Sequence, residues 1–136
     1  MIDNIKDPEG KHYFKEWLEN HQFSDVTLTS NQYSNYDIVA QKDGETYIYE
    51  LKNRPCYSTA YNDSIIELTK YDSLRSYAGH KYVVNFFKDC FYIVELEEEH
   101  ELQTYMCQKT NNWDRTRVKK TLVSYKHKEI NKYEYE

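Results

Sequence analysis

The chain of 136 residues suffices for one domain with a single hydrophobic core and is too short for two. Its 39% hydrophobic and 30% charged residues are typical of a globular protein, and a net charge of −5 argues against nucleic-acid binding by charge alone. No apolar run is long enough for a signal peptide or a transmembrane helix. Three scattered cysteines exclude a disulfide framework and a Cys-x-x-Cys zinc site. We therefore expect a cytoplasmic protein without a membrane partner.

The charge is unevenly distributed along the chain. Residues 1–108 hold ten Lys/Arg against nineteen Asp/Glu, whereas residues 109–136 hold eight against four. The basic C-terminal segment either contacts phosphates beside the active sheet or is a solvated tail of scattered charges.

The first predicted element is a helix over residues 8–21, because Asp7 is a suitable N-cap and Pro8 suits the first turn. Its predicted buried stripe recurs at helical spacing and consists of Phe14, Trp17, Leu18 and His21. Glu9 and Glu16 share a face nearly opposite this stripe, so solvent exposure is the better expectation for both. Residues 23–30 predict the first strand.

Residues 36–53 predict a β-hairpin, because strand-forming residues flank an Asp-Gly pair at 43–44. Side chains alternate between the faces of a strand, so Ile48, Glu50 and Lys52 share one face. An antiparallel return brings Asp37 beside Glu50. Two acids and a lysine then converge, which suits metal-assisted hydrolysis of a phosphodiester.

Asp37, followed after twelve residues by Glu50-Leu51-Lys52, resembles the motif of the PD-(D/E)XK nuclease superfamily, which includes many restriction endonucleases, Holliday-junction resolvases and RecB-type exonucleases. Tyr36 precedes the aspartate where that motif has proline. The alternative is an ordinary hairpin with a solvated Glu–Lys pair.

The resemblance implies that Asp37, Glu50 and the carbonyl of Leu51 bind Mg²⁺ or Mn²⁺ and that Lys52 orients the attacking water. Relatives often carry a third acid on the first helix, for which Glu9 and Glu16 are the candidates.

Pro55 ends the hairpin's second strand, and the preceding Arg54 is either a phosphate contact or a surface arginine. A second helix is predicted from residues 62–64 to Ala78, with Gly79 as its stop signal. Its predicted buried stripe contains Tyr71, Leu74 and Ala78, with Glu67 in the middle and Lys70 and Tyr77 at the edge.

Two interpretations of Glu67 remain. Superfamily relatives often have Gln-x-x-x-Tyr or Gln-x-x-Lys at this point, and the run from Glu67 to Lys70 and Tyr71 is similar to both. The resemblance implies that Glu67 orients Lys52 or a metal-bound water and that Lys70 and Tyr71 contact nucleic acid. Alternatively, Ser64 and Glu67 form a capping box.

A second strand pair is predicted at residues 81–87 and 91–96, followed by an acidic turn and a last strand at 118–125. Arg115 and Arg117, with Trp113, bind nucleic acid, or alternatively Trp113 caps the core while the two arginines pair with nearby acids. We expect residues 131–136 to be frayed.

The predicted order is helix, strand, hairpin, helix, hairpin and a final strand. We therefore expect an α/β fold with a restriction-endonuclease-like core, a mixed central β-sheet flanked by helices, and a single domain over residues 1–136. The expected function is a Mg²⁺- or Mn²⁺-dependent DNA nuclease, acting as a homodimer or with a partner protein. The alternatives are an inactive nuclease-fold module that binds nucleic acid or protein, and a purely structural α/β interaction protein.

Overall fold

The structure, a computed structural model, describes residues 10–29, 36–60, 62–96, 101–108 and 117–136, with only the backbone described at 101–108 and 117–120. The chain forms, in order, α1 (Lys11–Asn20), β1 (Ser24–Leu28), β2 (Ile38–Lys42), β3 (Glu45–Asn53), β4 (Asp63–Glu67), α2 (Leu68–Arg75), β5 (His80–Phe86), β6 (Phe91–Glu95), β7 (Glu101–Gln108), β8 (Arg117–Lys126) and β9 (Lys132–Tyr133). Short 3-10 turns lie at Ser58–Ala60 and Glu129–Asn131.

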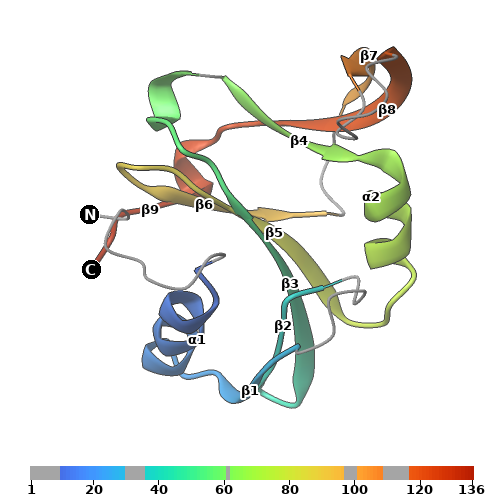
Figure 1. The fold of residues 1–136 in the computed structure, drawn as a ribbon. Helices are drawn as coiled ribbons and strands as arrows, with labels where there is room; N and C mark the ends of the chain where they lie inside the picture. The colour runs from blue at the N-terminus through green and yellow to red at the C-terminus, as the bar shows by residue number, and fades with distance from the viewer. Residues whose placement is uncertain (1–9, 30–35, 61, 97–100, 109–116) are drawn as a thin grey trace.

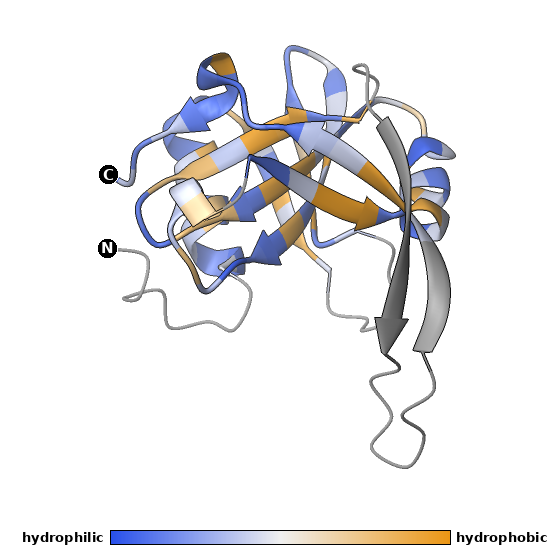
Figure 2. Ribbon diagram, turned by 90° about the horizontal axis from the view of Figure 1, so that it is seen from above, coloured by the Kyte–Doolittle hydropathy of each residue, from blue (hydrophilic) through white to orange (hydrophobic). Residues whose placement is uncertain are grey.

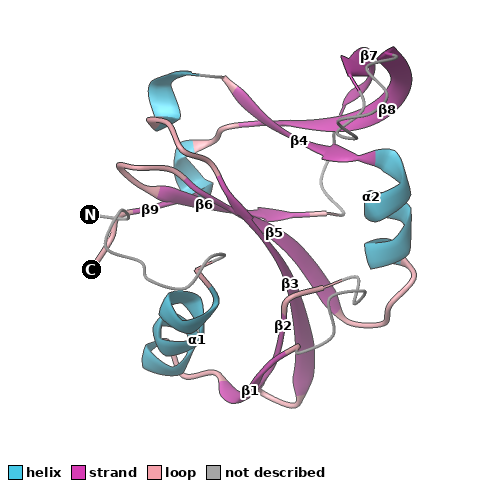
Figure 3. Cartoon of the chain, in the orientation of Figure 1, coloured by secondary structure: helices cyan, strands magenta, loops and turns pink. Residues whose placement is uncertain are grey.

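The fold is α/β, with a mixed six-stranded sheet in the order β1-β2-β3-β5-β6-β9 (Figures 1 and 3). Strands β3 and β5 run parallel, and every other pair in this sheet is antiparallel. Parallel neighbours need a crossover connection, which β4 and α2 supply here. Strand β4 belongs to a second, three-stranded sheet in the order β4-β8-β7.

The predicted hairpin is confirmed. Strands β2 and β3 pair antiparallel from Ile38 opposite Tyr49 to Lys42 opposite Glu45. The turn residues Asp43 and Gly44 both have positive φ angles, 52° and 78°, as a two-residue hairpin turn with the twist of the strands requires. This turn fixes the register of every residue in the two strands.

One face of the six-stranded sheet is covered by α1 (Figure 1). The predicted stripe residues Phe14, Trp17 and Leu18 are buried, and they pack on a cluster that also contains Ile38, Ala40, Tyr49, Leu51, Val84, Phe86 and Phe91. The helix that the structure describes begins at Lys11, after Gly10 with a φ of 71°. The expected start, residues 8 and 9, lies outside the described residues.

The opposite face is covered by α2 and by the three-stranded sheet. The cluster on this side contains Ile48, Ile66, Tyr71, Leu74, Val83, Phe87, Cys90, Tyr92, Val94, Leu96, Val123 and Tyr125. Apolar segments alternate with polar ones along the strands, as Figure 2 shows. Because β5 is covered on both faces, its residues Val83, Val84 and Phe86 are all buried.

The prediction of a helix from residue 62 to 78 is wrong at both ends. Residues 63–67 form β4, which pairs antiparallel with β8, and α2 starts only at Leu68 and ends at Arg75. The β-branched pair Ile65-Ile66 favours a strand, and the partner strand is about sixty residues further along the chain, where no local sequence signal shows it.

Glu67 is consequently the last residue of β4 and the N-cap of α2, with extended backbone angles and no side-chain capping bond. It does not lie in the buried stripe of α2. The capping-box interpretation is also wrong, because Ser64 lies in the strand and its hydroxyl bonds Nε2 of His127 at 2.8 Å.

The prediction that residues 131–136 are frayed is wrong as well. Strand β9 pairs with β6, and the Tyr135 hydroxyl donates to the carbonyl of Cys90 at 3.0 Å and to that of Phe87. Strand β7, which pairs with β8, was not predicted. The predicted strand pair at 81–87 and 91–96 and the last strand at 118–125 are confirmed as β5, β6 and β8.

Candidate active site

Strand β3 places three ionisable side chains on the same face of the sheet. Glu50 and Lys52 alternate with the core residues Tyr49 and Leu51, which face α1. The strand ends at Asn53, but the Arg54 N–H still donates to a carbonyl of β5, at 2.7 Å, so the backbone stays in the ladder. Glu50, Lys52 and Arg54 therefore follow one another along the side that faces β4 and α2.

Asp37 immediately precedes the first residue of β2, and its carboxylate extends the hairpin ladder. Its N–H donates to the Tyr49 carbonyl at 2.9 Å, and its Oδ2 accepts the N–H of Leu51 at 2.7 Å. A carboxylate oxygen thus replaces the next backbone carbonyl of β2. This bond fixes Asp37 next to Glu50, and the sequence-predicted convergence of these two residues is present in the structure.

Glu50 is a buried carboxyl group, with 4% of the residue exposed. Nζ of Lys70 in α2 lies 2.7 Å from its Oε2. Burial is the main cause that raises the pKa of Glu50 to about 7, and the hydrogen bond to Asp37 raises it further, while Lys70 opposes both effects. Asp37 and Glu50 are therefore held together at a site where the Glu50 carboxyl resists ionisation.

The first helix brings a cation to this pair. Nζ of Lys11, in the first turn of α1, lies 3.7 Å from Oδ1 of Asp37. The predicted first-helix acid Glu16 is exposed and borders a pocket with Trp17 and Glu136, away from Asp37. Glu9 lies outside the described residues. No periodicity in the sequence identified Lys11, because its role depends on where α1 docks on the sheet.

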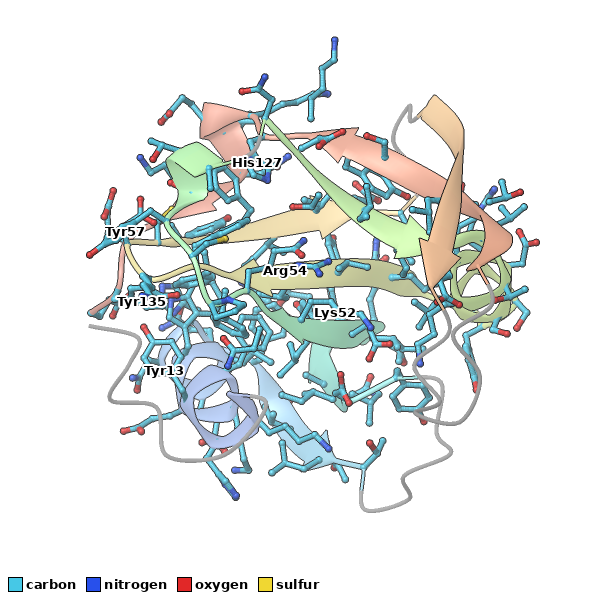
Figure 4. All side chains as sticks on the ribbon, turned by 45° about the horizontal axis from the view of Figure 1, so that its top comes forward. Tyr13, Lys52, Arg54, Tyr57, His127 and Tyr135 are labelled. Atoms are coloured by element: carbon cyan, nitrogen blue, oxygen red, sulfur yellow. The ribbon has the colours of Figure 1, made fainter. Side chains whose placement is uncertain are left out.

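A cleft of about 420 Å³, which we call the Lys52 cleft, shares Lys70 with the acid pair, since Lys70 lines the cleft and pairs with Glu50. It is lined by Lys52, Arg54, Ile65, Ile66, Glu67, Lys70 and Leu122. Figure 4 shows Lys52 and Arg54 on the side of the sheet that β4 crosses. Lys52 and Arg54 form no ion pair with a carboxylate among the described residues, so the cleft suits an anionic substrate. Leu122 of the basic segment β8 forms part of its wall.

The structure places the other predicted contacts differently. Lys70 lines the cleft and pairs with Glu50, as described above, whereas Tyr71 is 3% exposed and packs in the core, so its ring does not reach a surface where nucleic acid can bind. Arg115 lies outside the described residues, and Arg117 begins β8 without a described side chain.

The donor atoms fit a hard divalent cation. Asp37 and Glu50 supply carboxylate oxygens, and the Leu51 C=O points to the same edge as the Leu51 N–H that Asp37 accepts, because both groups of a strand residue face one side. Oxygen ligands of this kind suit Mg²⁺ and Mn²⁺. Among the described residues, no group of three or more His, Cys, Asp or Glu side chains is placed to hold a metal, so water and substrate would supply the remaining ligands.

The sequence matches no protein-family model, and a comparison with curated proteins finds no match. In the part of the chain that the structure describes, neither helix has the length and apolar character needed to cross a membrane.

Proposed function

We propose that the protein is a divalent-metal-dependent nuclease of the PD-(D/E)XK type, with a restriction-endonuclease-like core, that hydrolyses phosphodiester bonds in DNA. The observation that carries the proposal is that the Asp37 and Glu50 carboxyls lie side by side, and that Lys70, which pairs with Glu50, also lines a cleft with Lys52 and Arg54. A surface ion pair needs no buried carboxyl group with a raised pKa, and burying one costs stability.

Asp37, Glu50 and the Leu51 carbonyl would hold Mg²⁺ or Mn²⁺. The bound ion would neutralise charge on the scissile phosphate and lower the pKa of a coordinated water. Lys52 projects from the next position on the same face of β3, and no ion pair of Lys52 is found among the described residues. Its ammonium can therefore hold the attacking water or a phosphate oxygen.

Lys70 and Lys11 balance the two acids in the absence of a cation, through the ion pairs with Glu50 and Asp37. Glu67 lines the cleft together with Lys52. Its exposed carboxylate lies at the start of α2, one turn from Lys70, where it can still reach a water in the cleft.

The test is cleavage of single-stranded, duplex and branched DNA with Mg²⁺ or Mn²⁺ and with EDTA. We expect metal-dependent cleavage that falls at least about 100-fold in Asp37→Asn and in Lys52→Met, the size of effect seen when one electrostatic contact to a transition state is lost. Asp72→Asn, an exposed acid on α2, is the matched control and keeps full activity.

The Asp37→Asn variant should also fold normally. The amide oxygen of the introduced asparagine can still accept the Leu51 N–H, so the melting temperature should change little. Cleavage that persists in both Asp37→Asn and Lys52→Met, or in EDTA, refutes the assignment.

The inactive nuclease-fold module remains the second candidate, because both acids already have lysine partners, as in a site that no longer needs a metal. Calorimetric titration with Mn²⁺ separates the two. Binding that is lost in Asp37→Asn supports the nuclease, whereas no heat of binding together with no cleavage supports the module.

A further inference from the structure

Arg54 carries a partly buried charge that has only neutral partners. Its Nε donates to Oδ1 of Asn85 at 3.2 Å, and its Nη2 donates to the carbonyl of Ile65 at 3.0 Å. Burial lowers the pKa of the guanidinium, and no carboxylate pairs with it within the described ranges. A guanidinium has five N–H groups, so several remain to donate to an anion. Removing a charge from water without a counter-charge is unfavourable, which an anionic ligand would correct.

A second pocket begins at the same guanidinium. This pocket, the Arg54 pocket, measures about 610 Å³ and is lined by Arg54, Pro55, Cys56, Asp63, Ser64, Ile65 and Phe87. The volume lies within the range of roughly 300–1,000 Å³ that small-molecule sites occupy. It adjoins the Lys52 cleft, since Arg54 and Ile65 line both.

The chemistry of the Arg54 pocket is that of a nucleotide site. Pro55, Ile65 and Phe87 supply apolar walls for the faces of a planar base. Asp63 and Ser64 supply polar atoms that can meet the edge of a base, although both already have one partner, in Ser124 and His127. The guanidinium, which lines both this pocket and the Lys52 cleft, suits a phosphate, because its planar fork matches two phosphate oxygens.

The spacing along β3 matches consecutive phosphates. Lys52 and Arg54 are two residues apart on one extended segment, so their Cα atoms are separated by roughly 6.6 Å. This separation is comparable with that of adjacent phosphates along a nucleic-acid strand. In Figure 4, Lys52, Arg54 and Tyr57 follow one another in one direction, and Tyr57 is 55% exposed in the loop beyond the pocket.

We propose that the Arg54 pocket binds one unpaired nucleotide of a single-stranded DNA, with Arg54 on the phosphate adjacent to the scissile one and the base between Pro55, Ile65 and Phe87. The proposal rests on the proposed function and specifies its substrate class. A base inside a duplex is stacked and paired, so it cannot enter a pocket between two sheets without being extruded. Single-stranded DNA or a frayed end meets no such cost.

The first test measures binding without divalent cations, by fluorescence anisotropy of a labelled single-stranded oligonucleotide and of the same sequence as a duplex. We expect tighter binding of the single strand, and a loss of roughly 10- to 100-fold in Arg54→Gln, the effect of one charged hydrogen-bonded contact. Arg75→Gln removes the same charge from an exposed position on α2 and should change affinity by less than about threefold. Equal losses in the two variants, or preference for the duplex, overturn the proposal.

The second test uses the unaltered protein, so that a folding defect of a variant cannot imitate the result. Cys56 lines the Arg54 pocket and is partly accessible, whereas Cys90 is buried. Single-stranded oligonucleotide should slow alkylation of Cys56 by iodoacetamide, followed at that residue by peptide mass mapping, and the duplex should not. Unchanged alkylation refutes the site.

The two proposals fail separately. If single-stranded DNA binds in a way that depends on Arg54 but no metal-dependent cleavage occurs, the nuclease assignment is refuted and the nucleotide pocket is supported. If metal-dependent cleavage occurs only on duplex DNA and is unaffected by Arg54→Gln, the nucleotide pocket is refuted and the nuclease assignment is supported.

Discussion

The Glu50→Gln variant should be more stable than the unaltered protein at neutral and higher pH. The unfolded chain loses the Glu50 proton near its ordinary pKa of 4.5, whereas the folded protein holds it until about pH 7. Between these pH values the folded state binds one more proton than the unfolded chain. The contribution of Glu50 to the free energy of unfolding therefore falls as pH rises and is constant above about pH 7. The difference between the two pKa values corresponds to about 3 kcal/mol.

Glutamine resembles the protonated carboxyl and cannot lose a proton, so the stability of the variant does not fall with pH through this group. Its gain in free energy of unfolding should be about 3 kcal/mol larger at pH 8 than at pH 4.5. At pH 8 the variant also lacks the ion pair between Glu50 and Lys70, but the Lys70 side chain is 27% exposed and can be hydrated.

The assay is urea denaturation in EDTA at a series of pH values between 4.5 and 8, with Asp72→Asn as the control for removing an exposed acid. Repeating it with Mn²⁺ at pH 8 should stabilise the unaltered protein and leave Glu50→Gln unchanged. A stability difference between Glu50→Gln and the unaltered protein that is the same at every pH would show that the Glu50 carboxyl has an ordinary pKa and would remove the electrostatic basis of the site.

Two further predictions test the fold around the site. Gly79→Ala should lower the free energy of unfolding by roughly 2–4 kcal/mol, because φ is +95° and a Cβ would lie 2.6 Å from the Thr46 carbonyl oxygen. Gly44→Ala, with a φ of +78° and nothing within 4 Å of the added Cβ, should cost only about 1 kcal/mol, and equal losses measured by urea denaturation would contradict the packing of this loop on β3. Tyr135→Phe should destabilise by about 1 kcal/mol, because the single hydroxyl proton is shared between the carbonyls of Phe87 and Cys90, and no change in thermal unfolding would mean that the C-terminal residues are not docked.

Local signals in the sequence predicted the elements that carry the acid pair. The Asp-Gly turn specified the hairpin, and strand alternation then placed Glu50 and Lys52 on one face and Asp37 opposite Glu50. The same reasoning predicted the buried stripe of α1 and the strand pair β5–β6. These predictions succeeded because each depends on residues close together in the sequence.

Predictions that depend on a distant partner failed or were not made. Residues 63–67 carry capping residues that favour a helix start, but β8 offers a partner strand whose hydrogen bonds and burial of Ile66 outweigh that local preference. The sequence of the C-terminal residues alone predicts fraying, but in the structure β9 pairs with β6 and the Tyr135 hydroxyl bonds backbone carbonyls. No local pattern in the sequence points to Lys11 as part of the site, because its place depends on how α1 docks on the sheet.

The sequence by itself determined the hairpin, its register and therefore the pairing of Asp37 with Glu50, because a tight turn and a two-residue alternation leave one arrangement. Only the tertiary structure decided which cations meet those acids and what borders the cleft. The positions of Lys11, Lys70 and Arg54 depend on how α1, α2 and β4 dock on the two faces of the sheet. Docking is set by the fit of whole apolar surfaces, and no short stretch of the chain encodes it.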